Sequence, residues 1–180
     1  NWRARSRARP SGTGEVLSRT RDPHSDSLVE SLWQTDQRMK RDEALRPLSR
    51  EHLNALHAAK VLREGNDLEA VTEVFFDFWE DQGQRHFRIE EEVLLPHWAR
   101  YAEVDRPGVA RMLEEHLAIR REALRLRAGE TSLEEAQELG RLLHDHVRFE
   151  ERQLFPSVEE ALDADSLAEL AAKVEAAQAP

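Results

Sequence analysis

The stretch His86-Phe-Arg-Ile-Glu-Glu-Glu-Val-Leu-Leu-Pro96 returns later in the chain as His146-Val-Arg-Phe-Glu-Glu-Arg-Gln-Leu-Phe-Pro156. Six of the eleven positions are identical, namely His, Arg, Glu, Glu, Leu and Pro. In each copy a histidine stands four residues before a glutamate, so both side chains leave the same face of a helix. The repeat therefore presents the same pair of metal-binding side chains twice.

Each copy also has a histidine upstream, in Glu51-His52-Leu53 and in Glu115-His116-Leu117. The intervals from this histidine to the repeat are similar, 86 − 52 = 34 residues and 146 − 116 = 30 residues. One histidine followed by His-x-x-x-Glu, used twice, indicates two equivalent halves of a metal site.

The sequence around these motifs predicts helices and no strands. Apolar residues recur at helical spacing, and turn signals separate the segments over about 49–63, 68–95, 107–129, 132–155 and 165–177. We expect the second and fourth helices to end before Pro96 and Pro156, and Ser132-Leu-Glu-Glu135 to form a capping box. Short connections between long helices favour an all-α fold, an up-down-up-down four-helix bundle with an additional C-terminal helix.

Projection onto these helices places six polar side chains on the apolar stripes, pointing into one core. They are His52, His86, Glu90, His116, His146 and Glu150. A single inward histidine is more often a hydrogen-bonded core residue, and a single His-x-x-x-Glu pair is usually a surface contact. Six together differ, because each buried polar group without a partner costs about 2 kcal/mol or more. A bound cation would neutralise the two carboxylates directly, so we predict that these residues are metal ligands.

The types of ligand limit the choice of metal. The chain has no cysteine, which excludes thiolate and iron–sulfur sites within it. Imidazole with carboxylate suits iron, zinc or manganese, and two ions bridged by carboxylates fit the core of a bundle. The ferritin-like proteins use Glu-x-x-His, whereas here the histidine comes first and histidines outnumber carboxylates.

At these residues the chain resembles the hemerythrin-like (HHE cation-binding) family. The resemblance spans roughly residues 41–162 and rests on the order, spacing and flanking residues of the motifs. It implies an iron pair joined by an oxo or hydroxo bridge, with zinc or manganese as alternatives. In this family's pattern His52, His86, His116 and His146 would be terminal ligands, and Glu90 and Glu150 would bridge the two irons.

The chain departs from the family's oxygen carriers at Arg120, where they have a further histidine. Two six-coordinate ions need twelve ligand positions. The four imidazoles and two bridging carboxylates would fill eight, and a bridging oxygen would fill two. Two positions would remain for a small ligand, which favours redox chemistry or sensing over oxygen storage.

Neighbouring polar residues carry weaker signals. His57 and His144 lie well around their helices from the candidate ligands, so we expect them to face solvent or a neighbouring helix, and we expect a surface position for His97. Glu91 and Glu151 each follow a candidate bridging glutamate, and we expect them to pair with arginine or to support a ligand from outside.

Composition limits the classes of partner that the protein is expected to bind. The chain has a formal net charge of −10, and outside residues 1–38 it carries 26 − 7 = 19 basic and 36 − 5 = 31 acidic residues. A surface this negative argues against nucleic acid and anionic membranes as partners. No apolar stretch is long enough to span a bilayer, and no signal peptide is evident, so we expect a cytoplasmic protein.

Residues 1–40 differ from the rest and contain the alternating arginines Arg3, Arg5, Arg7 and Arg9. We interpret them as a disordered basic arm, or as an addition upstream of a start at Met39. Residues 41–180 would then form the bundle.

Two functions follow as hypotheses. The first is a non-heme diiron protein that binds or reduces a small oxidant: dioxygen, hydrogen peroxide or nitric oxide. The second is an iron- or redox-responsive module that signals its metal state to a protein partner without turnover. A structural remnant that holds zinc or no metal is a third possibility.

Overall fold

The computed structural model describes residues 41–178, and every regular element in that range is helical. The elements are α2 (Arg46–Glu64), α3 (Leu68–Phe78), η1 (Trp79–Gly83), α4 (Gln84–Ile89), η2 (Glu90–Leu94), α5 (Leu95–Tyr101), α6 (Arg106–Arg127), α7 (Leu133–Phe149), η3 (Glu150–Leu154), α8 (Phe155–Ala161) and α9 (Ala164–Gln178). The η segments are single π-helical turns. The predicted all-α class is confirmed, whereas the prediction for residues 1–40 lies outside the described range.

Local sequence explains where the helices begin. The Asp67 side chain caps α3 by accepting hydrogen bonds from two backbone N–H groups. Ser132 and Glu135 form the predicted capping box at the start of α7. The helices α2 and α6 instead have a proline in the first turn, where its missing N–H costs nothing.

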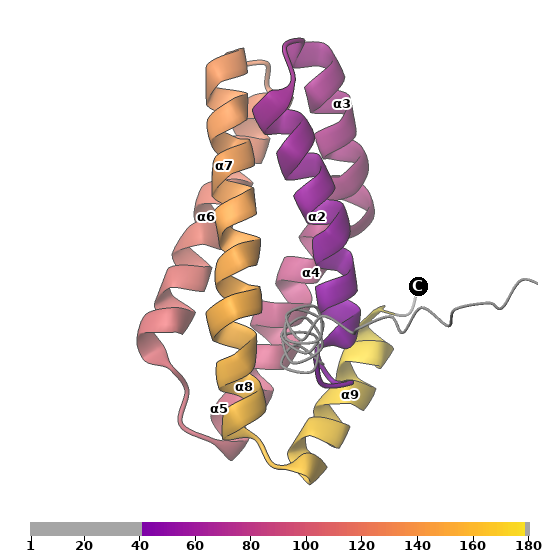
Figure 1. The fold of residues 1–180 in the computed structure, drawn as a ribbon, viewed down its shortest axis with the longest axis vertical. Helices are drawn as coiled ribbons and strands as arrows, with labels where there is room; N and C mark the ends of the chain where they lie inside the picture. Colours follow the sequence, from indigo (N-terminus) through magenta and orange to yellow (C-terminus); the bar gives the residue numbers. More distant parts are fainter. Residues whose placement is uncertain (1–40, 179–180) are drawn as a thin grey trace, which may run out of the picture. The chain divides into compact units, whose positions relative to one another are not determined.

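Four long helical runs lie side by side in alternating directions, and α9 lies along the lower side of the bundle against η2 and α4 (Figure 1). The runs are α2, then α3 through α5, then α6, then α7 through α8. Two apolar clusters fill the interior, one with Leu48 and Met112 and the other with Ala55 and Ile119. Along each helix the candidate ligands fall between these clusters, so the bundle encloses a polar layer between two apolar ones.

The two repeats do not end their helices, contrary to our expectation. The chain passes through Pro96 into α5 and through Pro156 into α8, each time directly after a π-helical turn. A π turn carries one extra residue, which shifts the hydrogen-bond register before the proline. The carbonyl that would meet the proline ring in an α-helix is thereby displaced, and the helix continues. Both π turns begin at a candidate bridging glutamate, Glu90 or Glu150.

The helix α9 is attached through His97, and the predicted surface position of this residue is wrong. His97 is buried, its Nε2–H donates to the Ser166 carbonyl oxygen at 2.8 Å, and its Nδ1 accepts from Lys173 Nζ at 3.0 Å. This histidine is therefore a packing and hydrogen-bonding residue between α5 and α9. Within residues 41–178 no helix combines the length and apolarity required to cross a membrane.

Candidate metal centre

The structure brings all six predicted ligands into the polar layer of the bundle. Each is almost completely buried: His52 on α2, His86 on α4, Glu90 on η2, His116 on α6, His146 on α7 and Glu150 on η3. Because both His-x-x-x-Glu pairs span the junction between an α-helix and a π turn, each histidine and its glutamate leave the helix toward the same interior.

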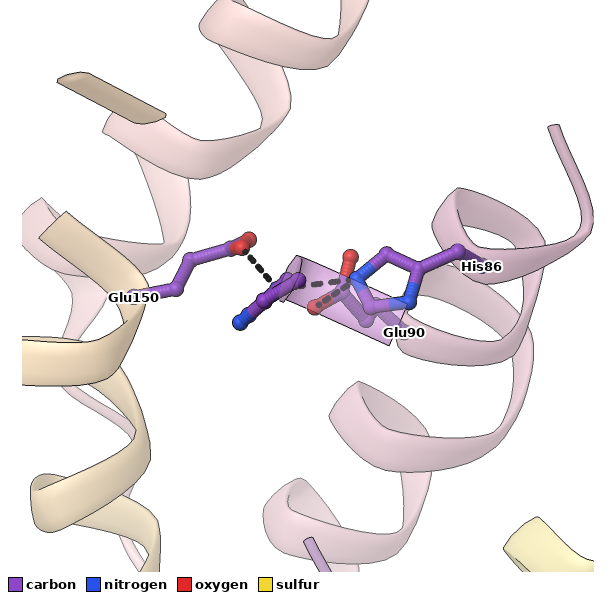
Figure 2. A group of neighbouring side chains, drawn as sticks. His86, Glu90 and Glu150 are labelled. Carbon is purple, nitrogen blue, oxygen red and sulfur yellow. Dashed lines mark hydrogen bonds and ion pairs between the residues drawn. The ribbon is translucent and has the colours of Figure 1, made fainter. Parts of the chain in front are cut away.

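The six side chains form two overlapping groups of four. His52 and His86, which we call the first half-site, lie with Glu90 and Glu150; His116 and His146, the second half-site, lie with the same two glutamates. In each group the donor atoms all lie within 4.8 Å of one another. Glu150 points toward Glu90 from the opposite helix, with His86 beside Glu90 (Figure 2). Both carboxylates are therefore placed to be shared between two ions.

The shared carboxylates are not satisfied by the protein. None of the four carboxylate oxygens of Glu90 and Glu150 has a hydrogen-bond partner, and neither does Nε2 of His116 or His146. Imidazole Nε2 atoms do lie within ion-pair distance, at 3.3 Å from His86 to Glu90 and 3.2 Å from His146 to Glu150. These contacts lack hydrogen-bond alignment, and the Nε2 atoms of His52 and His86 lie only 3.0 Å apart, so the donor atoms converge on a common centre. Buried atoms without partners cost about 1–3 kcal/mol each, so the site fits a cation.

The charges of these groups depend on one another. Burial and the neighbouring Glu150 would both raise the pKa of Glu90, but the imidazoles around it lower that pKa below its usual value. Burial alone would lower the pKa of His86, yet the Glu90 and Glu51 carboxylates raise it to about 10. The carboxylate pair thus requires positive charge between its members, which protonated imidazoles or a metal cation would supply.

A second layer of glutamates holds the four imidazoles by Nδ1. The distances are 2.6 Å from His52 to Glu151, 2.9 Å from His86 to Glu51, 2.7 Å from His116 to Glu91 and 3.0 Å from His146 to Glu115. An Nδ1–H that donates to a carboxylate leaves the lone pair on Nε2, the atom that faces the shared glutamates. This is the usual outer support of histidine that binds a metal.

Each of these glutamates in turn contacts an arginine. Arg41 binds Glu151 at 2.7 Å, Arg111 binds Glu115 at 2.7 Å, and Arg85 approaches Glu51 at 3.4 Å. Arg120 binds Glu91 through both of its terminal nitrogens, at 2.7 and 3.1 Å. Burial would raise the pKa of Glu91, but its hydrogen bonds with His116 and Arg120 lower that pKa to about 2. Glu91 therefore stays ionised near neutral pH and accepts both hydrogen bonds. The predicted pairing of Glu91 and Glu151 with arginine is confirmed.

Sequence reasoning gave no role to Glu51 and Glu115, although both stood in the quoted motifs. The signal was present, because each directly precedes a candidate ligand histidine. Each Glu-His pair spreads its two side chains to different partners: His52 faces the shared carboxylates, while Glu51 supports His86 on the neighbouring helix. The same division holds for His116 and Glu115.

His57 and His144 lie outside the site, as predicted. His57 is exposed, and His144 is partly exposed and contacts Asp145 at 2.9 Å. Neither belongs to a group of potential metal ligands among the described residues.

A four-helix bundle with two shared carboxylates and four imidazoles in its core defines a helical metal-binding protein. A comparison with family models agrees: the model of the hemerythrin HHE cation-binding domain matches residues 43–158. The chain belongs to this family, and the match covers all six candidate ligands. Searches of curated proteins and of solved structures found no match.

Proposed function

We propose that this protein binds two iron ions between Glu90 and Glu150 and uses them to bind or reduce a small oxidant. The candidate oxidants are dioxygen, hydrogen peroxide and nitric oxide. The observation that carries the proposal is the pair of two-histidine, two-glutamate groups that share both glutamates. Shared carboxylates between equivalent histidine pairs suit two like ions held close together.

The nature of the donors supports iron. Imidazole and carboxylate side chains are the donors of non-heme iron sites, and the family match points to the same chemistry. Zinc and manganese accept the same donors and are the alternatives. When bound, the iron pair supplies the redox capacity that no side chain of this site has by itself.

The surroundings of the site favour a very small ligand. A cavity of about 10 Å³ lies against His52, His86 and His146, and its other walls include Ala55, Phe78 and Leu143. A volume of about 10–15 Å³ is the minimum for one water molecule, so even a diatomic molecule or peroxide requires some side-chain movement and larger ligands are excluded. The apolar walls exclude bulk water from this side of the site.

The protein's own residues position the inner ligands. The Nδ1 hydrogen bonds to Glu51, Glu91, Glu115 and Glu151 fix the direction of every imidazole. Aromatic rings limit their movement further: Phe87 stacks on His116 with centroids 3.7 Å apart, and Phe155 stacks on His52 at 5.3 Å. The imidazoles are therefore prearranged for an ion rather than folded around it.

The environment of Arg120 favours redox chemistry or sensing over oxygen carriage. Its guanidinium is held by Glu91 and lies over the Phe87 ring, 5.3 Å from the ring centroid. Arg120 thus supports His116 from outside and adds no donor to the centre. With four histidines and two glutamates as the inner donors, coordination positions would remain for solvent or an oxidant at each of the two ions.

A responsive module that reports its metal state is the second candidate function. One contact favours it: Gln178 Nε2, at the end of α9, donates to Glu51 Oε1 at 3.1 Å, and Glu51 holds His86. A change at His86 would thereby reach the last described helix of the chain.

Iron loading followed by a peroxide assay tests the proposal. Metal-free protein is reconstituted with ferrous iron without oxygen, and its absorption spectrum and rate of peroxide consumption are then measured. We expect two irons per chain, near-ultraviolet bands of an oxo-bridged pair in air, and turnover that His116→Ala abolishes. The variant His57→Ala is the matched control, because it removes an exposed histidine outside the site. Iron binding without peroxide, dioxygen or nitric oxide chemistry would favour the module. One zinc per chain without visible absorption in the protein as first purified would contradict both iron hypotheses.

A further inference from the structure

The internal repeat relates two helix interfaces, and they differ in one respect. Because His52 corresponds to His116 and His86 to His146, the contact of α2 with α7 corresponds to that of α6 with η1 and α4. Gly140 on α7, six residues before His146, corresponds to Trp79 on η1, seven residues before His86, because the π turn η1 carries one extra residue. The two interfaces should therefore look alike, apart from what a glycine and a tryptophan do to them.

At the first interface the glycine allows close contact. A Cβ atom on Gly140 would lie 2.7 Å from the Leu62 Cβ and 2.8 Å from the Ala59 carbonyl oxygen, so α2 packs directly on this residue. At the second interface the Trp79 side chain stands in its place, and the carboxylate of the next residue, Glu80, binds Arg127 at 2.5 Å. A groove of about 640 Å³ lies here between α6 and the segment η1–α4.

The groove is basic on a protein that is otherwise acidic. Three arginines line it, Arg88, Arg120 and Arg127, against the single acid Glu80, whereas the whole chain has a net charge of −10. Its remaining walls include Trp79, Ala123 and Leu124. A volume of about 300–1,000 Å³ with apolar walls and a few charged groups is typical of small-molecule sites.

Arg88 is the arginine that is available to a ligand. Arg120 is engaged by Glu91 and Arg127 by Glu80, whereas Arg88 is exposed and has no hydrogen bond or ion pair with any residue between 41 and 178. Its counterpart in the second repeat, Arg148, is equally exposed but is not among the residues that line the groove.

We propose that this groove binds a small organic anion, a molecule with a carboxylate or phosphate group and an apolar part. The guanidinium of Arg88 makes the main contact with the anionic group, because a planar guanidinium can donate two parallel hydrogen bonds to it. The apolar part lies along Trp79, Ala123 and Leu124. This site goes beyond the proposed oxidant chemistry. The proposal does not depend on which metal the centre binds.

The groove is also connected to the metal centre. Arg120 lines the groove and binds Glu91, which accepts the Nδ1–H of His116. An anion in the groove competes with Glu91 for the Arg120 guanidinium. Its binding therefore weakens the hold of Arg120 on Glu91 and changes the hydrogen bond at His116.

Calorimetric titration of the metal-free protein tests the site without interference from metal chelation. Phenylacetate and phenyl phosphate are the two probes, each an anionic group on an apolar ring, so that a carboxylate preference and a phosphate preference can be told apart at constant ionic strength. We expect one binding site per chain, and an affinity about tenfold or more lower in Arg88→Gln, because the main charged contact is lost. The matched variant Arg148→Gln, with the same charge change at the corresponding position, keeps its affinity within about twofold.

The connection to the centre is measured in the same samples by the NMR signals of the histidine side chains. We expect saturating anion to shift the His116 ring signals more than those of His52, and Arg88→Gln to require a higher anion concentration for the same shift. No binding of either probe, or equal affinity in the two arginine variants, would overturn the site. Binding of a hexaglutamate peptide without binding of phenylacetate or phenyl phosphate would overturn the small-molecule assignment, and a His116 signal unmoved at saturation would overturn the connection.

Discussion

The two half-sites present the same inner side chains but are held differently from outside. His146 of the second half-site is supported by Glu115, which Arg111 binds at 2.7 Å. In the first half-site His86 is supported by Glu51, whose arginine contact is longer, at 3.4 Å, and which also binds Gln178. The repeat thus duplicates the donors that face the centre, while the surrounding helices are free to specialise.

The same contrast appears at the helix interfaces. Gly140 lets α2 and α7 pack closely, whereas Trp79 and Glu80 line a basic groove between α6 and the segment η1–α4. An inner ligand must match both the corresponding ligand of the other half-site and the shared carboxylates, whereas an outer residue contacts only its own neighbours. This explains why the halves agree in the centre and diverge toward the surface.

The largest effect should come from the residues that belong to both halves. Glu150→Gln keeps the shape of the side chain and removes the shared charge, so we expect the metal content to fall from two ions per chain to none. His52→Ala should lose only the ion of the first half-site. Metal analysis after gel filtration measures both variants beside the His57→Ala control, and two ions retained by Glu150→Gln would refute the shared role.

The outer glutamates should have smaller effects, confined to their own imidazoles. Glu91→Gln should weaken metal binding at the second half-site by about 10–100-fold, since the amide no longer anchors His116 Nδ1 as a charged acceptor. Competition with a chromophoric chelator measures this affinity. Glu92→Gln, an exposed neighbour, is the control. An equal loss in both variants would show that the hydrogen bond to His116 contributes nothing.

A methyl group at Gly140 tests the difference between the interfaces in the metal-free protein. Gly140→Ala should destabilise the fold by about 1–3 kcal/mol, because the added Cβ meets the Ala59 carbonyl and Leu62. At the second interface Glu80→Ala, next to the matched residue Trp79, removes only an exposed ion pair and should change stability by no more than about 0.5 kcal/mol. Urea denaturation measures the free energy of unfolding of both variants. Similar losses of stability would contradict the proposed difference between the two interfaces.

The smallest expected effect on stability concerns the N-terminal capping of helices from the two half-sites. α7 has a capping box, whereas no side chain caps α2. The backbone hydrogen bond from Ser132 and the Arg125 contact lower the pKa of Glu135 to about 2. Because the pKa is depressed in the folded state, this stabilisation is complete above pH 4.5 and disappears as the pH falls toward 2. Glu135→Ala should therefore lower the melting temperature at pH 7 and lose this effect near pH 2; a constant difference across this range would contradict the assignment.

Much of the fold and the inner site could be predicted from sequence, because both depend on local spacing. A histidine and a glutamate four residues apart share a helix face regardless of the tertiary structure, and six inward polar groups exclude an ordinary core. The capping box at Ser132 is likewise a local pattern. The six predicted side chains accordingly meet in one layer.

The unpredicted features depend on neighbours distant in the sequence. The π turns preserve the helix through Pro96 and Pro156, although each proline alone indicates an end. From the sequence alone we expect His97 at the surface, but in the structure α9 packs over it and it is buried. The roles of Glu51 and Glu115 become visible only when the neighbouring helix supplies the histidine that each of them supports.

The anomalous diffraction of crystals of the iron-loaded protein tests the central claim most directly. The account predicts two iron peaks between Glu90 and Glu150, one beside His52 and His86 and the other beside His116 and His146. A single peak in this layer, or iron bound only outside it, would contradict two half-sites that share their carboxylates.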